Sequence, residues 1–174
     1  MKLTTPVQKF IVHWGEMGAR WGINRSVAQI HALLYISGHP LAADEIAETL
    51  DIARSNVSTG LKELQSWGLV RISHQLGDRR DHFETLSDVW ETFRVILRER
   101  KRRELEPTLH VLRECAADSK SSATPGAQEA GERLASMLEF LELADGWGER
   151  AAKLSPQNLR RLSKLGDSIF RLVE

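Results

Sequence analysis

The side chains best suited to chemistry lie between residues 54 and 67, where small polar and cationic residues alternate with buried positions. At 100° per residue, a helix over this stretch turns Val57, Leu61 and Leu64 toward a core. Its opposite face is short, polar and nearly free of acid, as contact with base edges requires. The candidate nucleic-acid-contacting residues on this helix are Arg54, Ser55, Asn56, Ser58, Thr59 and Lys62.

A second cationic feature follows at residues 78–80. The Gly77-Asp78 turn separates two extended segments, residues 69–74 and 81–86, and so predicts a β-hairpin with Arg79 and Arg80 at its tip. A tip arginine can enter a narrow minor groove, whose negative potential attracts it. Asp78 is interpreted as a brace for the Arg80 guanidinium. A solvated turn with incidental charges is the alternative interpretation.

These candidates need a scaffold, and the preceding sequence supplies one. A short helix is predicted over residues 43–50, with a break at 51–52 before the polar helix over 54–67. A support helix starts at Asn24 or Ser26 and ends near Ser37, where Gly38 and Pro40 follow. The two helices and the hairpin together predict a winged helix-turn-helix.

Three segments carry a resemblance to a known family: NRSVAQIHALLYISG, RSNVSTGLKELQSWGLV and GDRRDHFETLSDVW. They resemble the MarR family of winged-helix regulators, and its GbsR branch most closely. The resemblance covers nearly the whole chain and is most specific from Trp21 to Glu104. It implies a homodimeric transcriptional regulator that places the helix over 54–67 in the major groove of double-stranded DNA and Arg80 in the minor groove. One departure is Ala42, which cannot cap the following helix as the Thr or Ser of many relatives does.

The expected fold is mainly α with a small β-wing, in three parts. Residues 1–22 form an N-terminal dimerisation helix, for which Thr5 is the expected cap, with Pro6 at its first position. Glycines at 15, 18 and 22 either end this helix near Gly18 or let it approach another backbone closely. Residues 23–88 form the winged helix-turn-helix domain. Residues 89–174 form a helical dimerisation and effector region with a linker at about 118–126.

Within the C-terminal region, Pro107 is expected to kink the helix near residues 103–106. The preceding run RERKRR predicts a solvated face, with neutralisation of flanking phosphates as the alternative. A further helix is expected to end at residues 146–148. A last helix begins at Ser155-Pro156 and carries an interface seam of Leu162, Leu165, Ile169 and Leu172.

Composition limits the other classes of function. The 174 residues carry a net charge of +0, which disfavours a basic surface over the whole chain and favours the alternative of a winged helix used only for protein association. No Gly-rich phosphate loop, nucleophile elbow or metal-ligand spacing occurs, so we expect no enzyme, metal or cofactor.

No apolar run of about 20 residues and no signal segment occurs, so we expect no membrane association. The single cysteine, Cys115, is expected to be a buried, inert thiol, and a cytoplasmic location fits.

Four tryptophans and the single tyrosine lie outside the polar helix and raise the question of a small-molecule effector. Aromatic cages bind quaternary ammonium groups, and the GbsR branch is associated with osmoprotectants. Packing in the core and at interfaces is the favoured interpretation, since large aromatic side chains usually serve there. The candidate pocket residues are Trp14, Trp21, Tyr35, Trp90 and Trp147.

Overall fold

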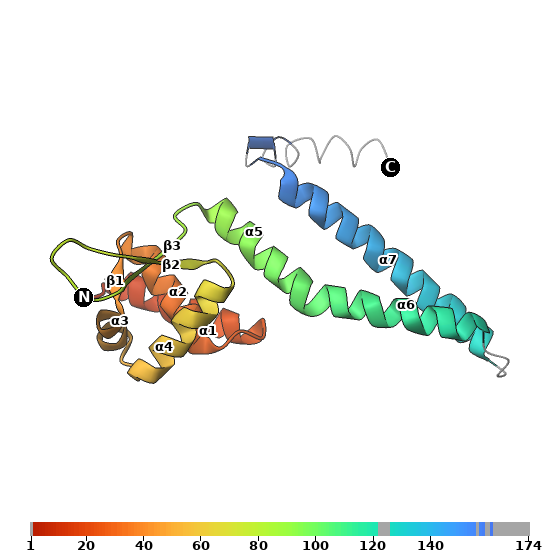
Figure 1. Ribbon diagram of the computed structural model, residues 1–174, viewed down its shortest axis with the longest axis horizontal. Coiled ribbons are helices and arrows are strands. Elements are labelled where there is room, and N and C mark those ends of the chain that lie inside the picture. The colour runs from red at the N-terminus through yellow and green to blue at the C-terminus, as the bar shows by residue number, and fades with distance from the viewer. Residues whose placement is uncertain (1, 122–125, 156, 159–160, 162–174) are drawn as a thin grey trace. The chain divides into compact units, whose positions relative to one another are not determined.

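Short helices, each stopped by a capping residue or a glycine, build the N-terminal part of the chain. The computed structural model (Figure 1) describes residues 2–121, 126–155, 157–158 and 161. It divides into two units, Met1–Ile96 and Leu97–Glu174. The expected class, mainly helical with a small antiparallel sheet, is confirmed. None of the described helices is long and apolar enough to cross a membrane.

The first two helices pack closely because glycines line their contact. Helix α1 (Thr5–Arg20) begins at the expected cap residue itself, because Thr4 is its N-cap, and the helix continues past Gly18. A Cβ atom on Gly18 would lie 2.5 Å from the Ala28 Cβ of α2 (Arg25–Ser37), so the glycine permits close approach rather than ending the helix. Asn24 caps α2 as predicted, with its Oδ1 accepting from the Ser26 N–H at 2.8 Å. Gly38, with φ 65°, ends it.

The helix-turn-helix has the predicted bounds to within a residue. Helix α3 (Ala43–Leu50) ends where Asp51 adopts a left-handed conformation with φ 52°, and α4 (Arg54–Ser66) follows. Ala42 supplies no capping oxygen, but its N–H donates to Glu45 Oε2 at 2.8 Å. Half of a capping box therefore survives without a capping side chain.

The wing is a three-stranded sheet, one strand more than the expected two-stranded ribbon. Strands β1 (Leu41–Ala42), β2 (Val70–Ser73) and β3 (His82–Thr85) are antiparallel in the order β1-β3-β2. The register pairs β3 residue Phe83 with Ile72 on one side and with Leu41 on the other. β1 was missed because two residues are too few to show alternation.

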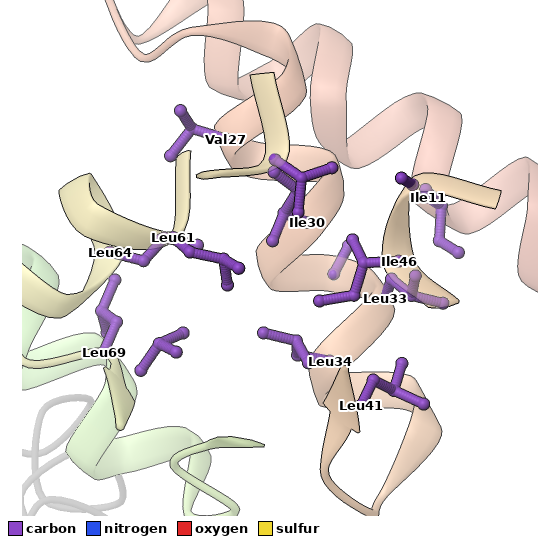
Figure 2. Close-up of a cluster of buried hydrophobic side chains, with 14 residues drawn as sticks. Ile11, Val27, Ile30, Leu33, Leu34, Leu41, Ile46, Leu61, Leu64 and Leu69 are labelled. Atoms are coloured by element: carbon purple, nitrogen blue, oxygen red, sulfur yellow. The ribbon is translucent and has the colours of Figure 1, made fainter. Parts of the chain in front are cut away.

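One hydrophobic core holds this unit together (Figure 2). Ile30 and Leu33 of α2, Ile46 of α3, and Leu61 and Leu64 of α4 are almost wholly buried in it. Burying each such side chain contributes about 1.5–3 kcal/mol. Because the apolar face of α4 is committed to this core, its polar face must point outward.

In the second unit, a helical hairpin follows the end of α5 (Val89–Arg100). A π-helical turn, η1 (Lys101–Leu105), leads into α6 (Glu106–Ser121), and α7 (Ala127–Lys153) packs against α6. The predicted disruption near Pro107 takes the form of this π turn. Gly131 permits the helices to meet, since a Cβ there would lie 2.9 Å from the Ser119 Cβ.

Three expectations for this unit differ from the structure. Helix α6 continues to Ser121, through the first part of the expected linker, and α7 passes Gly146 and Gly148 without a break. Cys115 is exposed, because the neighbouring Leu112 and Ala116 occupy the buried positions of α6. The predicted seam of Leu162, Leu165, Ile169 and Leu172 lies outside the described residues.

Candidate nucleic-acid interface

The outer face of α4 is open along its first two turns. Val57, Gly60 and Leu61 are buried, and a Cβ on Gly60 would lie 2.7 Å from Ile30 Cδ1, so α4 lies directly on α2. The candidate side chains on the other side are all exposed, and we find no side-chain partner for any of them in the described part of the chain. These are Arg54, Ser55, Asn56, Ser58, Thr59 and Lys62.

One acidic residue adjoins this face toward its C-terminal end. Glu63 follows Thr59 by four residues, so it lies 40° from it around the helix, and it is half-buried. The first turn contains no acid, and its cap residue, Ala53, makes no side-chain hydrogen bond. The exposed Arg54 and the positive end of the helix dipole therefore coincide at the first turn of α4, whereas Lys62 lies two turns further along.

Asp78 and Arg80 are joined at the base of the wing tip. Arg80 Nη2 donates to Asp78 Oδ2 at 2.7 Å, and Arg80 Nε donates to the same oxygen at 3.0 Å. The Arg80 backbone N–H also donates to Asp78 Oδ1 at 2.9 Å. These bonds lower the pKa of Asp78 to about 2, so the carboxylate stays charged at neutral pH.

Arg80 also reaches outside the wing, which sequence reasoning missed. Its Nη1 donates to Asp44 Oδ2 and Oδ1 at 3.0 and 3.1 Å, and its Nη2 lies 3.6 Å from Glu45 Oε1. The Arg80 hydrogen bond lowers the pKa of Asp44. No local signal links residues so distant in sequence. The guanidinium thus ties the wing to the first turn of α3.

Arg79, by contrast, is free. It is exposed, and the described residues offer it no ion pair or hydrogen-bonded side chain. Nearby, His82 is buried, with Nδ1 3.0 Å from the Arg80 carbonyl oxygen and Nε2 3.5 Å from Asp78 Oδ2. The two tip arginines therefore occupy different situations: Arg80 is held by carboxylates, and Arg79 projects into solvent.

The five candidate pocket aromatics are not brought together. Trp14 and Trp21 line a cavity of about 30 Å³ in the first unit, together with His31, Trp67, Leu64 and Ile96. Tyr35 and Trp90 are not among its lining residues, and Trp147 belongs to the second unit. Its lining is almost entirely apolar.

His31 is the one titratable side chain in that lining. It is buried, and its Nε2 has no hydrogen-bond partner in the part of the chain that the structure describes. Burial lowers the pKa of the imidazole from 6.5 to about 4, so the ring is neutral at physiological pH.

The basic run of residues 98–103 is largely engaged in ion pairs. Arg100 pairs with Glu104 at 3.3 Å and Arg102 with Glu99 at 2.7 Å. Lys101 contacts Asp145 at 2.9 Å and also Glu149. This arrangement agrees with a solvated helical face that also joins the hairpin.

Comparison with known proteins agrees with this geometry. Residues 17–81 match the family model described as MarR family. Over these residues the winged helix of this chain is similar to the MarR family. The resemblance expected from the sequence is thereby confirmed.

Two similar proteins give the extent of the similarity. The HTH-type transcriptional repressor GbsR of Bacillus subtilis (strain 168) is 28% identical over 98 residues, which are 56% of this chain and 54% of that protein. The match thus spans about half the length of that relative. A crystal structure of a transcriptional regulator, at 21% identity, superposes with a TM-score of 0.64 over 84% of this chain and 95% of its own, and shows the shared fold.

Proposed function

We propose that this protein is a cytoplasmic transcriptional regulator that binds specific double-stranded DNA as a homodimer. The observation that carries the proposal is the outer face of α4, where six polar or cationic side chains are exposed and have no side-chain partner among the described residues. None of the six is a large apolar or aromatic side chain, the type that anchors most protein–protein interfaces. The similarity to the GbsR repressor supports the same conclusion.

In this proposal α4 enters the major groove. Asn56 has the amide geometry for adenine, and Ser55, Ser58 and Thr59 can donate or accept at base edges. Arg54 and Lys62 lie at the flanks, where they reach phosphates. The wing, with Arg79 and Arg80 near its tip, lies over the adjacent minor groove.

The net charge of +0 is compatible with DNA binding because the cations are local. Many acids elsewhere are paired with bases of their own unit, as in Arg113–Glu142 and Arg133–Glu129. Affinity then depends on a few phosphate contacts in each copy, doubled in a dimer. Half-sites should lie about one helical turn apart, ~34–36 Å, or a multiple of this.

Dimerisation is supported by an apolar stripe on α7. Met137, Phe140, Leu143 and Trp147 follow at three- and four-residue spacing, and each is more than half exposed. Such a stripe is unfavourable in water and fits the same stripe of a second copy. Sedimentation should show a dimer for the wild type and for Phe140→Leu, and a monomer for Phe140→Arg. A monomeric wild type would contradict this part of the proposal.

Regulation by a small quaternary-ammonium effector stays a prediction. The 30 Å³ cavity beside Trp14 and Trp21 would have to open to admit one. This prediction is tested by following the intrinsic tryptophan fluorescence while choline or betaine is added. An unchanged spectrum would contradict an aromatic cage for such an effector.

The decisive experiment for DNA binding is a gel shift. Fragments from upstream of the protein's own gene are mixed with the full chain, with and without an excess of unrelated competitor DNA. A complex that survives the competitor supports a sequence-specific regulator. Absence of any complex at low salt overturns the proposal and favours a winged helix used for protein association.

A further inference from the structure

The most exposed large hydrophobic residue among those described is Leu76, which is fully exposed. It belongs by sequence to the loop between β2 and β3, a loop that can be followed in Figure 1. It does not belong to the core or to the apolar stripe of α7. A single exposed leucine needs no explanation by itself. Here, however, the leucine lies on a hydrogen-bonded turn next to an exposed arginine.

The backbone that carries Leu76 is fixed. The Asp78 N–H donates to the Gln75 carbonyl oxygen at 3.2 Å and closes a tight turn with Leu76 and Gly77 at its centre. Gly77 has φ 86°, the left-handed conformation that the third position of a type II turn requires. The leucine therefore stands at the crest of an ordered turn.

The base of the same loop is fixed as well. Asp78 holds Arg80 through both the side chain and the backbone N–H, and Arg80 is bound to Asp44 of α3. Arg80 thereby acts as a positioning residue that sets where the wing tip lies on the helix-turn-helix. A preorganised loop loses little conformational entropy when it binds a partner.

Among the described residues, the exposed side chains of this loop without a hydrogen-bond or ion-pair partner are Gln75, Leu76 and Arg79, of which Leu76 is the apolar one and Arg79 the cation. Together the last two present one apolar group and one free cation. The minor groove of DNA matches this pair, because phosphates and an enhanced negative potential line it while its sugar walls and base steps accept apolar groups.

We propose that Leu76 enters the minor groove of DNA beside Arg79 as an apolar contact of the wing. This inference rests on the proposed function and assigns a binding role to a residue outside the polar and cationic set. Arg79 supplies the electrostatic part of the contact. Leu76 supplies the part that does not depend on salt.

The test uses the full chain and a duplex that the wild type selects from a random-sequence pool. We expect Leu76→Ala to weaken binding about tenfold, with an unchanged slope of log K against log salt, because the lost contact is apolar. Arg79→Ala should lower the steepness of that slope by about 0.9, as loss of one phosphate contact does. Leu76→Met should retain most of the affinity.

Gln75→Ala is the matched control, since it truncates an exposed side chain of similar size on the same turn. It should bind as the wild type does, and Leu76→Ala should unfold at the wild-type temperature. Wild-type affinity in Leu76→Ala, or an equal loss in Gln75→Ala, overturns this inference alone. A wild type that selects no duplex overturns the proposed function itself.

Discussion

Arg80 and Asp44 lie 36 residues apart, yet the Arg80 Nη1 group donates to both carboxylate oxygens of Asp44 at 3.0 and 3.1 Å. One side chain comes from the wing and the other from the first turn of α3. Both are nearly half exposed, so the pair contributes little to overall stability. Its consequence is geometric: the wing is held at one position on the helix-turn-helix.

The substitution Asp44→Asn tests this contact, because the two possible roles of Asp44 predict opposite changes in DNA affinity. Removing a negative charge near DNA should strengthen binding if charge alone mattered. We expect weaker binding, because Arg80 loses its charged partner on α3 and the wing is released. Fluorescence anisotropy with the selected duplex measures it. As a control, Glu48→Gln removes an exposed acid from the same helix and should not weaken binding. Tighter binding by Asp44→Asn would contradict the role of the Arg80–Asp44 pair in holding the wing.

Two substitutions on α4 separate affinity from specificity. Lys62→Ala should weaken binding to all duplexes alike and reduce the salt slope by about 0.9, as loss of a phosphate contact does. Asn56→Ala should cost about 1–3 kcal/mol on the selected duplex and little on unrelated DNA, because a base contact is lost. Binding isotherms at several salt concentrations measure both effects. Lys9→Ala, an exposed lysine of α1, should leave them unchanged.

The buried His31 makes stability depend on pH in a defined window. The unfolded imidazole gains its proton near pH 6.5, while the folded one resists protonation until about pH 4. The unfolded state therefore binds more protons between these values, and the free energy of unfolding falls as pH falls, by about 3 kcal/mol across the window. Urea titrations from pH 7 to pH 4 would measure this loss.

The control for this prediction is His31→Phe, which keeps a ring and removes the titration and the unpartnered Nε2. It should be more stable than the wild type at pH 4 and show a flatter profile. The carboxylate of Asp78 affects the free energy of unfolding mainly at lower pH, because its pKa is about 2 in the folded protein against an ordinary value of 3.8. A wild-type profile as flat as that of the variant would exclude His31 as the cause.

Two glycine-to-alanine changes should act in opposite directions. Gly18→Ala would place its Cβ 2.5 Å from the Ala28 Cβ, which has no rotamer to escape, so α1 and α2 must separate and stability falls by about 1–3 kcal/mol. Gly146→Ala in α7 meets nothing within 4 Å and should gain about 1 kcal/mol from helix propensity. Calorimetry of both variants measures the shifts. An unaffected Gly18→Ala protein would mean that the helices do not meet there.

Local physical chemistry accounts for what the sequence could predict. Asn24 and Gly38 delimit α2, and apolar periodicity locates α3 and α4 to within a residue. The outward orientation of the polar face of α4 follows from the same periodicity, since the apolar face must pack against the core. The wing turn follows from Gly77 and Asp78.

Predictions failed where a signal was too short or too weak. The two residues of β1, Leu41 and Ala42, show no pattern until Phe83 and His82 of β3 pair with them. Gly146 and Gly148 lower helix propensity, but the contact of α7 with α6 outweighs that cost.

By itself, the sequence determined the order of the helices, the hairpin and the side chains offered on α4, because caps, turns and 3.6-residue periodicity act between near neighbours. Only the tertiary structure decided that Arg80 binds Asp44 while Arg79 stays free, and that Trp14 and Trp21 share a cavity with His31 rather than with Tyr35. These pairings depend on which surfaces meet once the core has formed, and no spacing along the chain encodes a distance between residues that folding brings together.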